Sequence, residues 1–191
     1  MSGPGISKER IEKELLSWLE TILIAIAAVA LMVTFIGRLM QVDGSSMEPT
    51  LHDGERLITT PLYGRLKQGD IVVIRRKDGH PIVKRVVGTP GDVVDIDFSA
   101  HEVRINGELL DEPYIKEPTE RSFDVEFPIT VPEGAYFVMG DNRNNSDDSR
   151  HSTIGMIDQR NIFGKAVLRV WPFEAFGGLD VPSRTEQEDP S

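Results

Sequence analysis

Residues 81–92 read Pro-Ile-Val-Lys-Arg-Val-Val-Gly-Thr-Pro-Gly-Asp, a short run of branched apolar side chains that ends in a turn rich in glycine and proline. Val and Ile favour β-strands, whereas glycine and proline favour the turns that end them. Alternation along a strand places Lys84 on one face with Ile82 and Val86, and Arg85 on the other face. The stretch therefore predicts a strand that carries one lysine on an otherwise apolar face.

The same pattern recurs along most of the chain. Short runs rich in Val and Ile, separated by turns, predict strands at residues 56–59, 70–75, 82–87, 93–96, 103–105, 109–110, 135–139 and 165–171. Asn106-Gly107 predicts a type I′ hairpin. After residue 40, a helical period is suggested only at 158–162. The fold class is thus mostly β: an antiparallel sheet or partial barrel, with the more acidic residues 97–132 as a small inserted hairpin subdomain.

The N-terminal region has a different composition. Residues 1–17 form a charged leader, and residues 18–40 contain an apolar run from Ile22 to Ile36 that only Thr34 interrupts. A helix over 18–40 would reach roughly 34 Å, enough to span a bilayer. A cleavable secretory signal is the alternative, but its apolar run is usually shorter and no small-x-small cleavage site follows here. A single transmembrane anchor is therefore predicted.

Charges flanking this segment predict its orientation. Lys8, Arg10 and Lys13 precede it and Arg38 follows it, which places the N-terminus in the cytoplasm. The localisation predicted is the plasma membrane, with a single-pass anchor and a β-rich domain at 41–176 that is extracytoplasmic. Residues 177–191 offer nothing to bury and are expected to be a disordered acidic tail.

Composition excludes several classes of function. The chain has 191 residues and a net charge of -10, which argues against a nucleic-acid partner because phosphate binding needs clustered Lys and Arg. It has no cysteine, so it has neither a disulfide nor a thiolate zinc site. The four histidines show no His-x-x-x-His spacing. We therefore expect no metal and no cofactor.

A candidate nucleophile lies directly after the apolar segment. Residues 43–51 read Asp-Gly-Ser-Ser-Met-Glu-Pro-Thr-Leu, in which Gly44 and Pro49 indicate a fixed loop around Ser46. A serine attacks a carbonyl only if a base takes its proton. Burial can lower the pKa of a lysine by several units, so that Lys84 could be this base. The alternative is that Lys84 extends along its strand to water.

A third stretch is rich in small polar and charged residues. Residues 139–150 read Met-Gly-Asp-Asn-Arg-Asn-Asn-Ser-Asp-Asp-Ser-Arg after a predicted strand. Such a composition indicates a loop with local hydrogen bonds. It could also be a purely structural turn held by Asp–Arg pairing.

Taken together, four motifs in order behind an apolar segment resemble the type I signal peptidases, or leader peptidase family. The matching stretches are residues 46–50, 69–72, 84–92 and 140–150, and the similarity runs to about residue 173. The resemblance implies membrane-anchored serine endopeptidases that use a serine-lysine dyad. They cut signal peptides from secreted preproteins after small residues at positions -3 and -1, through an acyl-enzyme, with the substrate bound as an added β-strand.

The resemblance also implies roles for single residues. Ser46 matches the nucleophile, whose backbone N–H faces the oxyanion, and Lys84 matches the general base. Ser146 matches a serine that orients the lysine, and Asp148 and Arg150 match an ion pair that shapes the loop. A substrate-binding residue is matched by Met47. The implied partners are secreted preproteins with signal peptides, membrane lipid and a nearby secretion translocon.

One position departs from part of the family. Some members carry a serine two residues before the nucleophile as a second oxyanion donor, whereas this chain has Gly44. Glycine at this position is similar to members from Gram-positive bacteria. Loss of such a donor costs about 2.7 to 4 kcal/mol in other hydrolases, so the identity of a second donor is open.

Three other functions compete with this interpretation. A Ser-His-Asp triad could use His80 or His151, but neither lies in a recognisable triad motif. Self-cleaving repressors share the dyad, but they are soluble and carry a DNA-binding domain where this chain has its apolar segment. An anchored β module for adhesion would explain the strands, but it gives no reason for Lys84 or for the loop at 139–150.

Overall fold

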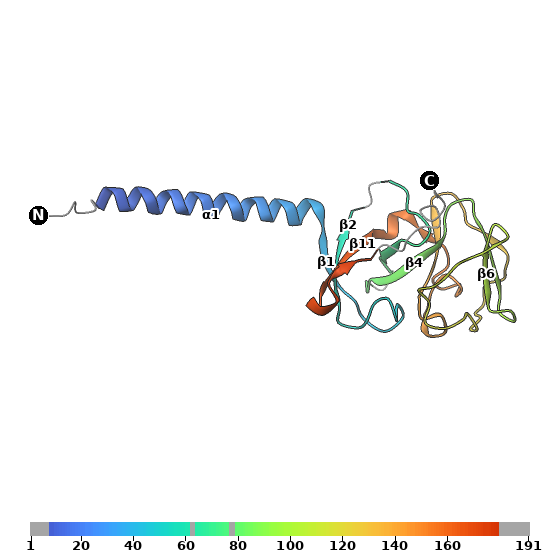
Figure 1. Ribbon diagram of the computed structural model, residues 1–191. Coiled ribbons are helices and arrows are strands. Elements are labelled where there is room, and N and C mark those ends of the chain that lie inside the picture. Colours follow the sequence, from blue (N-terminus) through green and yellow to red (C-terminus); the bar gives the residue numbers. More distant parts are fainter. Residues whose placement is uncertain (1–7, 62–63, 77–78, 180–191) are drawn as a thin grey trace, which may run out of the picture. The chain divides into compact units, whose positions relative to one another are not determined.

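A computed structural model describes residues 8–61, 64–76 and 79–179, and the chain divides into two compact units between Arg38 and Leu39. The first unit contains helix α1 (Lys8–Ile36) (Figure 1). The predicted transmembrane helix was placed at 18–40. Within the described residues, however, no helix is both long enough and apolar enough to cross a membrane.

The bounds of α1 also differ from the prediction. The helix begins within the charged leader, where Lys, Glu and Leu are strong helix formers. It ends at Ile36, before Gly37, because glycine disfavours a helix interior and often ends one. Residues predicted to end the helix instead form strand β1 (Arg38–Gln41).

The second unit is built on one large sheet of eight strands. Its order is β1-β2-β11-β3-β4-β9-β10, and β12 also pairs with β11. Figure 1 shows β2, β11 and β4 in this sheet. Its other members are β2 (Arg56–Thr60), β3 (Ile71–Ile74), β4 (Ile82–Gly88), β9 (Ala135–Met139), β10 (Ile157–Asp158), β11 (Ile162–Trp171) and β12 (Gly177–Gly178). The predicted strands that fall in this sheet are confirmed.

The sheet curls along its longest strand. β11 pairs antiparallel with β2 and β3, and its register shifts against both of them. Such shifts bend a strand and increase its twist. Strand β4 is buried along almost its whole length, with Val83 in one apolar cluster and Val86 in another. Lys84, between them, is only 3% exposed.

A second sheet has the order β7-β6-β5-β8. Its strands are β5 (Val93–Asp97), β6 (Glu102–Ile105), β7 (Glu108–Leu109) and β8 (Ile129–Thr130). Asn106 and Gly107 both have positive φ, 54° and 86°, between the paired residues Ile105 and Glu108. The predicted type I′ hairpin is thus confirmed. The two sheets share a core, because Phe137 of β9 clusters with residues of β5 and β6.

Short helical turns and the end of the chain complete the unit. The 3-10 turns are η1 (Arg143–Asn145), η2 (Gln159–Asn161) and η3 (Phe173–Ala175), so the helical period suggested at 158–162 corresponds to the single turn η2. The sequence assigned residue 177 onward to a tail. Gly177 and Gly178 instead pair with β11, and Leu179 is buried in the core. Residues 180–191 of that tail lie outside the described residues.

Candidate active site

Ser46 lies in a tight turn that follows β1. Gly44 enters this turn at φ 84°, a conformation that favours glycine. Its N–H donates to a carboxylate oxygen of Asp53 at 2.8 Å. Two residues after Ser46, the Glu48 N–H donates to the Ser45 carbonyl at 3.2 Å. The backbone on both sides of the serine is therefore held by hydrogen bonds.

The side chain of Met47 anchors the turn to the core. Met47 is 1% exposed and clusters with Leu51, Leu57 and Val83. Its side chain thus packs in the core, and the substrate-binding role that the resemblance implied for Met47 stays a prediction. Sequence spacing could not reveal this inward direction because a turn has no regular side-chain period.

Lys84 projects from β4 to the hydroxyl of Ser46. Its Nζ lies 2.7 Å from the Ser46 Oγ and 3.1 Å from the carbonyl oxygen of Val83. Strand β4 is held between β3 and β9, which fixes the base of the lysine side chain. Two parts of the predicted site that are 38 positions apart in the sequence are thus brought into direct contact. The side chain does not extend to bulk water, the alternative that the sequence left open.

Burial changes the protonation of this lysine. Removal of the ammonium from water lowers the pKa of Lys84 from its ordinary 10.5 to about 8. The nearby carboxylates of Asp148, Asp147 and Asp141 favour the charged form, so they oppose this shift without cancelling it. Near pH 8 about half of the molecules therefore carry a neutral amine, which can accept a proton from the serine.

The loop at 140–150 holds the serine turn from the other side. The Asn142 N–H donates to the Ser46 carbonyl at 3.0 Å, and the Asn142 side-chain amide donates to the Ser45 carbonyl at 3.0 Å. The Asn145 amide donates to the Ser45 hydroxyl at 2.9 Å. Two of these bonds hold the carbonyls of Ser45 and Ser46, and the third holds the Ser45 side chain. The loop therefore fixes the backbone on both sides of the Ser46 side chain.

Gly140 and Ser146 lie directly behind the dyad. A Cβ on Gly140 would lie 2.3 Å from the Ser146 Oγ and 2.4 Å from the Ser46 carbonyl oxygen. Ser146 is 3% exposed, and its hydroxyl makes no hydrogen bond within the described part of the chain. The hydroxyl is thus buried beside the serine turn with its hydrogen-bonding capacity unused.

Asp148 and Arg150 form an ion pair that is fully buried. Arg150 Nε and Nη2 donate to the two Asp148 oxygens at 2.8 and 2.9 Å. The same carboxylate accepts the Gly140 N–H at 3.1 Å, and Arg150 Nη2 donates to the Arg143 carbonyl at 2.6 Å. The pair therefore connects both ends of the loop, which fixes its shape.

A second buried ion pair was not identified from the sequence. Arg85 Nε and Nη2 donate to the two oxygens of Asp141 at 2.8 and 2.6 Å, and the Thr50 hydroxyl donates to Asp141 at 2.6 Å. The Tyr114 ring lies 4.0 Å from the Arg85 guanidinium carbon. This network joins the serine turn, the lysine strand and the loop. Thr50, Arg85 and Asp141 all lie in stretches that match the family, but no pattern in the sequence paired them.

The histidines of the competing triad lie elsewhere. His151 bonds to Thr153 and contacts the ring of Phe123 at 5.3 Å between centroids. His80 is exposed on the approach to β4. Within the described residues, the Ser46 hydroxyl is hydrogen-bonded to Lys84 and to no histidine. The geometry thus favours the lysine as the base.

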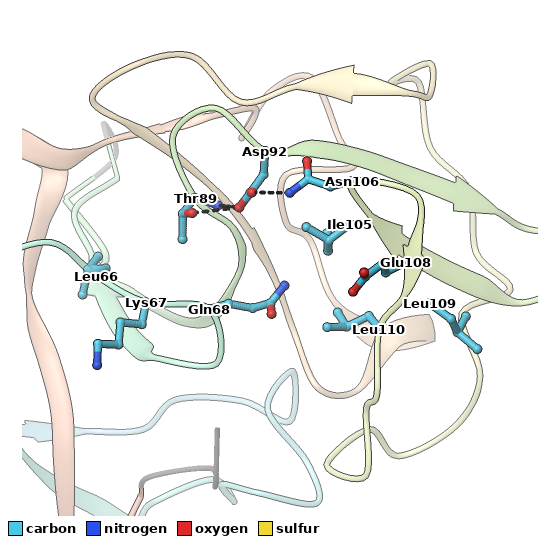
Figure 2. Close-up of a pocket in the computed structure, with 10 residues that line it drawn as sticks. All are labelled: Leu66, Lys67, Gln68, Thr89, Asp92, Ile105, Asn106, Glu108, Leu109 and Leu110. Carbon is cyan, nitrogen blue, oxygen red and sulfur yellow. Dashed lines mark hydrogen bonds between the residues drawn. The ribbon is translucent and has the colours of Figure 1, made fainter. Parts of the chain in front are cut away.

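An open groove of about 570 Å³ lies away from these contacts. Figure 2 shows its walls: the loop at 66–68, the turn of Thr89 and Asp92, and the β6–β7 hairpin. Neither Ser46 nor Lys84 lines it. The groove is therefore separate from the contact between Ser46 and Lys84.

The comparisons with known proteins agree on one family. Residues 15–171 match the family model described as signal peptidase, peptidase S26. Signal peptidase I of Bacillus licheniformis is 40% identical over 181 residues, which cover 88% of this chain and 95% of that protein. Signal peptidase IB of Staphylococcus aureus is 35% identical over 194 residues, which cover 92% of this chain and 100% of that protein.

A solved structure of a signal peptidase I from Enterococcus faecalis is also similar. It is 30% identical, covers 55% of this chain and 98% of its own, and has a TM-score of 0.46. The family model spans most of the chain, and the curated relatives match over nearly their whole length. The chain therefore belongs to the type I signal peptidase family, in the branch found in Gram-positive bacteria, and is a hydrolase of the serine peptidase class.

Proposed function

We propose that this enzyme removes signal peptides from exported preproteins, with Ser46 as nucleophile and Lys84 as general base. The observation that carries the proposal is the 2.7 Å contact between the Ser46 Oγ and the Lys84 Nζ. Its support is twofold. The lysine is buried with a pKa lowered to about 8, and the relatives are named signal peptidases.

In the first half of the reaction, neutral Lys84 accepts the hydroxyl proton while the Ser46 Oγ bonds to the scissile carbonyl carbon. The carbonyl π electrons move to its oxygen. When this tetrahedral intermediate collapses, the C–N bond breaks and the leaving amine takes the proton from the Lys84 ammonium. The mature protein departs, and the signal peptide remains as an ester on Ser46.

In the second half, water attacks this ester. Lys84 accepts a proton from the water, and the Ser46 oxygen leaves and takes the proton back. The signal peptide departs with a new carboxylate. One amine therefore acts as base and then as acid in each half, which requires a pKa near the working pH.

The backbone N–H of Ser46 is the proposed oxyanion donor. The Ser45 carbonyl accepts hydrogen bonds from the Glu48 N–H and from the Asn142 amide. In a trans peptide the N–H points opposite to the carbonyl. The Ser46 N–H is therefore turned away from these inner contacts, toward the side from which a substrate carbonyl would approach. Gly44 has no side chain to add a second donor.

The proposed supporting roles follow from the loop geometry. The buried Ser146 hydroxyl has no other partner in the described residues and could orient the amine of Lys84 during proton transfer. Asp148 and Arg150 shape the loop, because they are fully buried and bonded to each other. The Asp148 carboxylate also favours the charged form of Lys84. The substrate is proposed to bind as an added β-strand, with small side chains at -1 and -3.

We also propose that the enzyme works at the plasma membrane, with the N-terminus cytoplasmic and the catalytic unit outside. The support is the apolar sequence from Ile22 to Ile36 and the basic residues before it. Lipid and a nearby translocon would then be its surroundings. Carbonate extraction of cell membranes tests this proposal, since an integral protein stays in the pellet and a peripheral one is released.

Cleavage of a preprotein tests the proposed function. The full chain in detergent is incubated with a secreted preprotein, and the new N-terminus is identified by mass spectrometry. We expect one cut after a small-x-small sequence. In Ser46→Ala the rate of product formation should fall by at least about 10³-fold. Ser99→Ala is the matched control, because it removes an exposed serine hydroxyl from the turn between β5 and β6 and should leave cleavage unchanged. Cleavage by Ser46→Ala at the wild-type rate would refute the assignment.

A further inference from the structure

A segment between β7 and β8 lies along the catalytic loop. We call residues 112–121 the strap. The Lys116 N–H donates to the Asp141 carbonyl at 3.0 Å. The Asn144 side-chain oxygen accepts the N–H groups of Glu120 and Arg121, both at 3.0 Å. The strap is thus bonded to the loop along its backbone, although the two are far apart in sequence.

Buried charges strengthen this attachment. The two oxygens of Glu112 accept hydrogen bonds from Arg143, and the Arg143 Nη1 also bonds to the Thr119 hydroxyl at 2.9 Å. Arg143 in turn donates from Nε to the Gly140 carbonyl at 3.1 Å. Glu112 and Thr119, near the two ends of the strap, therefore bind the same residue, Arg143. Arg143 also bonds to Gly140, which lies beside the serine turn.

One strap residue also reaches the nucleophile turn. The Lys116 Nζ lies 2.9 Å from a carboxylate oxygen of Glu48, two residues after Ser46. The Glu48 N–H closes the turn onto the Ser45 carbonyl. The side chains of the pair are 47% and 26% exposed, so the contact lies at the rim of the site. The ion pair thus constrains Glu48, whose backbone N–H helps to hold the turn that contains Ser46.

Lys116 consequently connects both halves of the dyad. Its side chain holds the serine turn through Glu48. Its backbone holds the carbonyl of Asp141, whose carboxylate bonds to Arg85, the neighbour of the base Lys84. A small shift between nucleophile and base can cost a large factor in rate. Lys116 links the serine turn to the strand that carries Lys84, so its loss should affect the rate of the reaction.

We propose that Lys116 is a positioning residue, which keeps Ser46 in line with Lys84 by its ion pair with Glu48. The inference rests on the proposed function of Ser46. Lys116 does not touch the reacting atoms, and its charge is not among the causes of the shifted pKa of Lys84. Loss of the ion pair should thus lower kcat without moving the pH at which activity rises.

A charge-exchange cycle on the full chain tests this. We expect Lys116→Met and Glu48→Gln each to lower kcat about 3- to 10-fold with KM changed less than about twofold, because binding is retained while alignment is lost. The double variant should be no worse than either single one, and E48K/K116E should recover at least half of the wild-type kcat. The midpoint of the pH profile should stay in place throughout.

Arg160→Met is the matched control, because it breaks the exposed ion pair between Arg160 of η2 and Asp158 of β10 and should leave kcat unchanged. Wild-type kcat in Lys116→Met, additive losses in the double variant, or no recovery in E48K/K116E would each overturn the inference. Ser46→Ala separates the two levels. If it still cleaves, the proposed function fails. If it is inactive while Lys116→Met is unimpaired, only the positioning role fails.

Discussion

Lys84→Met is expected to be nearly inactive and yet more stable than the wild type. Loss of a general base costs about 10²- to 10⁴-fold in kcat/KM. The side chain is 3% exposed, so methionine fits a site that disfavours an ammonium. The fall of its pKa from 10.5 to about 8 corresponds to roughly 3 kcal/mol of lost stability at neutral pH. The lost hydrogen bonds offset about 1 kcal/mol of this gain.

The stability difference should depend on pH in a defined direction. Below pH 8 the lysine is charged in both the folded and unfolded states, so the full penalty is present. Between pH 8 and 10.5 the unfolded chain binds more protons, so the stability of the wild type rises with pH. The advantage of Lys84→Met, about 2 kcal/mol or about 5 °C in Tm at pH 7, should therefore shrink above pH 8 and vanish before pH 10.5. Above that pH the wild type should be more stable by the roughly 1 kcal/mol of its hydrogen bonds.

Thermal unfolding in detergent at several pH values measures this difference, and cleavage of a preprotein measures the loss of activity. A variant that lacks both His80 and His151 is the control and should retain activity. An active Lys84→Met, or an inactive histidine variant, would contradict the assignment of Lys84 as the base and would point to a histidine instead. If Lys84→Met were less stable than the wild type at pH 7, the buried Lys84 ammonium would not destabilise the folded protein, and this prediction would be wrong.

Gly140→Ala is expected to lower kcat/KM at least about 100-fold. The added Cβ would lie 2.4 Å from the Ser46 carbonyl oxygen and 2.3 Å from the Ser146 hydroxyl. Ser146 could rotate, but the carbonyl is fixed by the Asn142 N–H, so the nucleophile turn itself must move. A displacement near 1 Å is enough for a loss of this size. Steady-state cleavage measures it, and circular dichroism checks that the variant folds.

Gly178→Ala is the matched control for this substitution. Gly178 also lies in the second unit, and a Cβ there meets nothing within 4 Å. It should therefore cleave at the wild-type rate. If Gly140→Ala were as active as Gly178→Ala, the close packing of the loop against the serine turn would not govern catalysis.

The fold was largely predictable where the pattern is local. Strands such as β4 and the hairpin at Asn106-Gly107 depend on residues adjacent in sequence, and their prediction is confirmed. Helix α1 begins at Lys8 rather than at residue 18, because the Lys, Glu and Leu of the charged leader are strong helix formers that continue into the apolar run. The burial of Leu179 was missed because a single apolar residue after two glycines gives no period.

The site was predictable only where a motif marks it. Ser46 and Lys84 were identified from four ordered motifs, and the alternation along β4 gave Lys84 an apolar face. The bonds of Thr50 to Asp141 and of Glu48 to Lys116 join residues that are 91 and 68 positions apart. No local pattern specifies such pairs, because they depend on how the two sheets and the loop pack together.

The pH dependence of kcat/KM tests the central claim most directly, namely that an uncharged Lys84 takes the proton of Ser46. Because only the neutral amine is active, the rate should rise about tenfold per pH unit below pH 8 and level off above it, with a midpoint near the pKa of about 8. A profile that is flat from about pH 5 to 9, or one with its midpoint near the histidine value of about 6.5, would contradict the account.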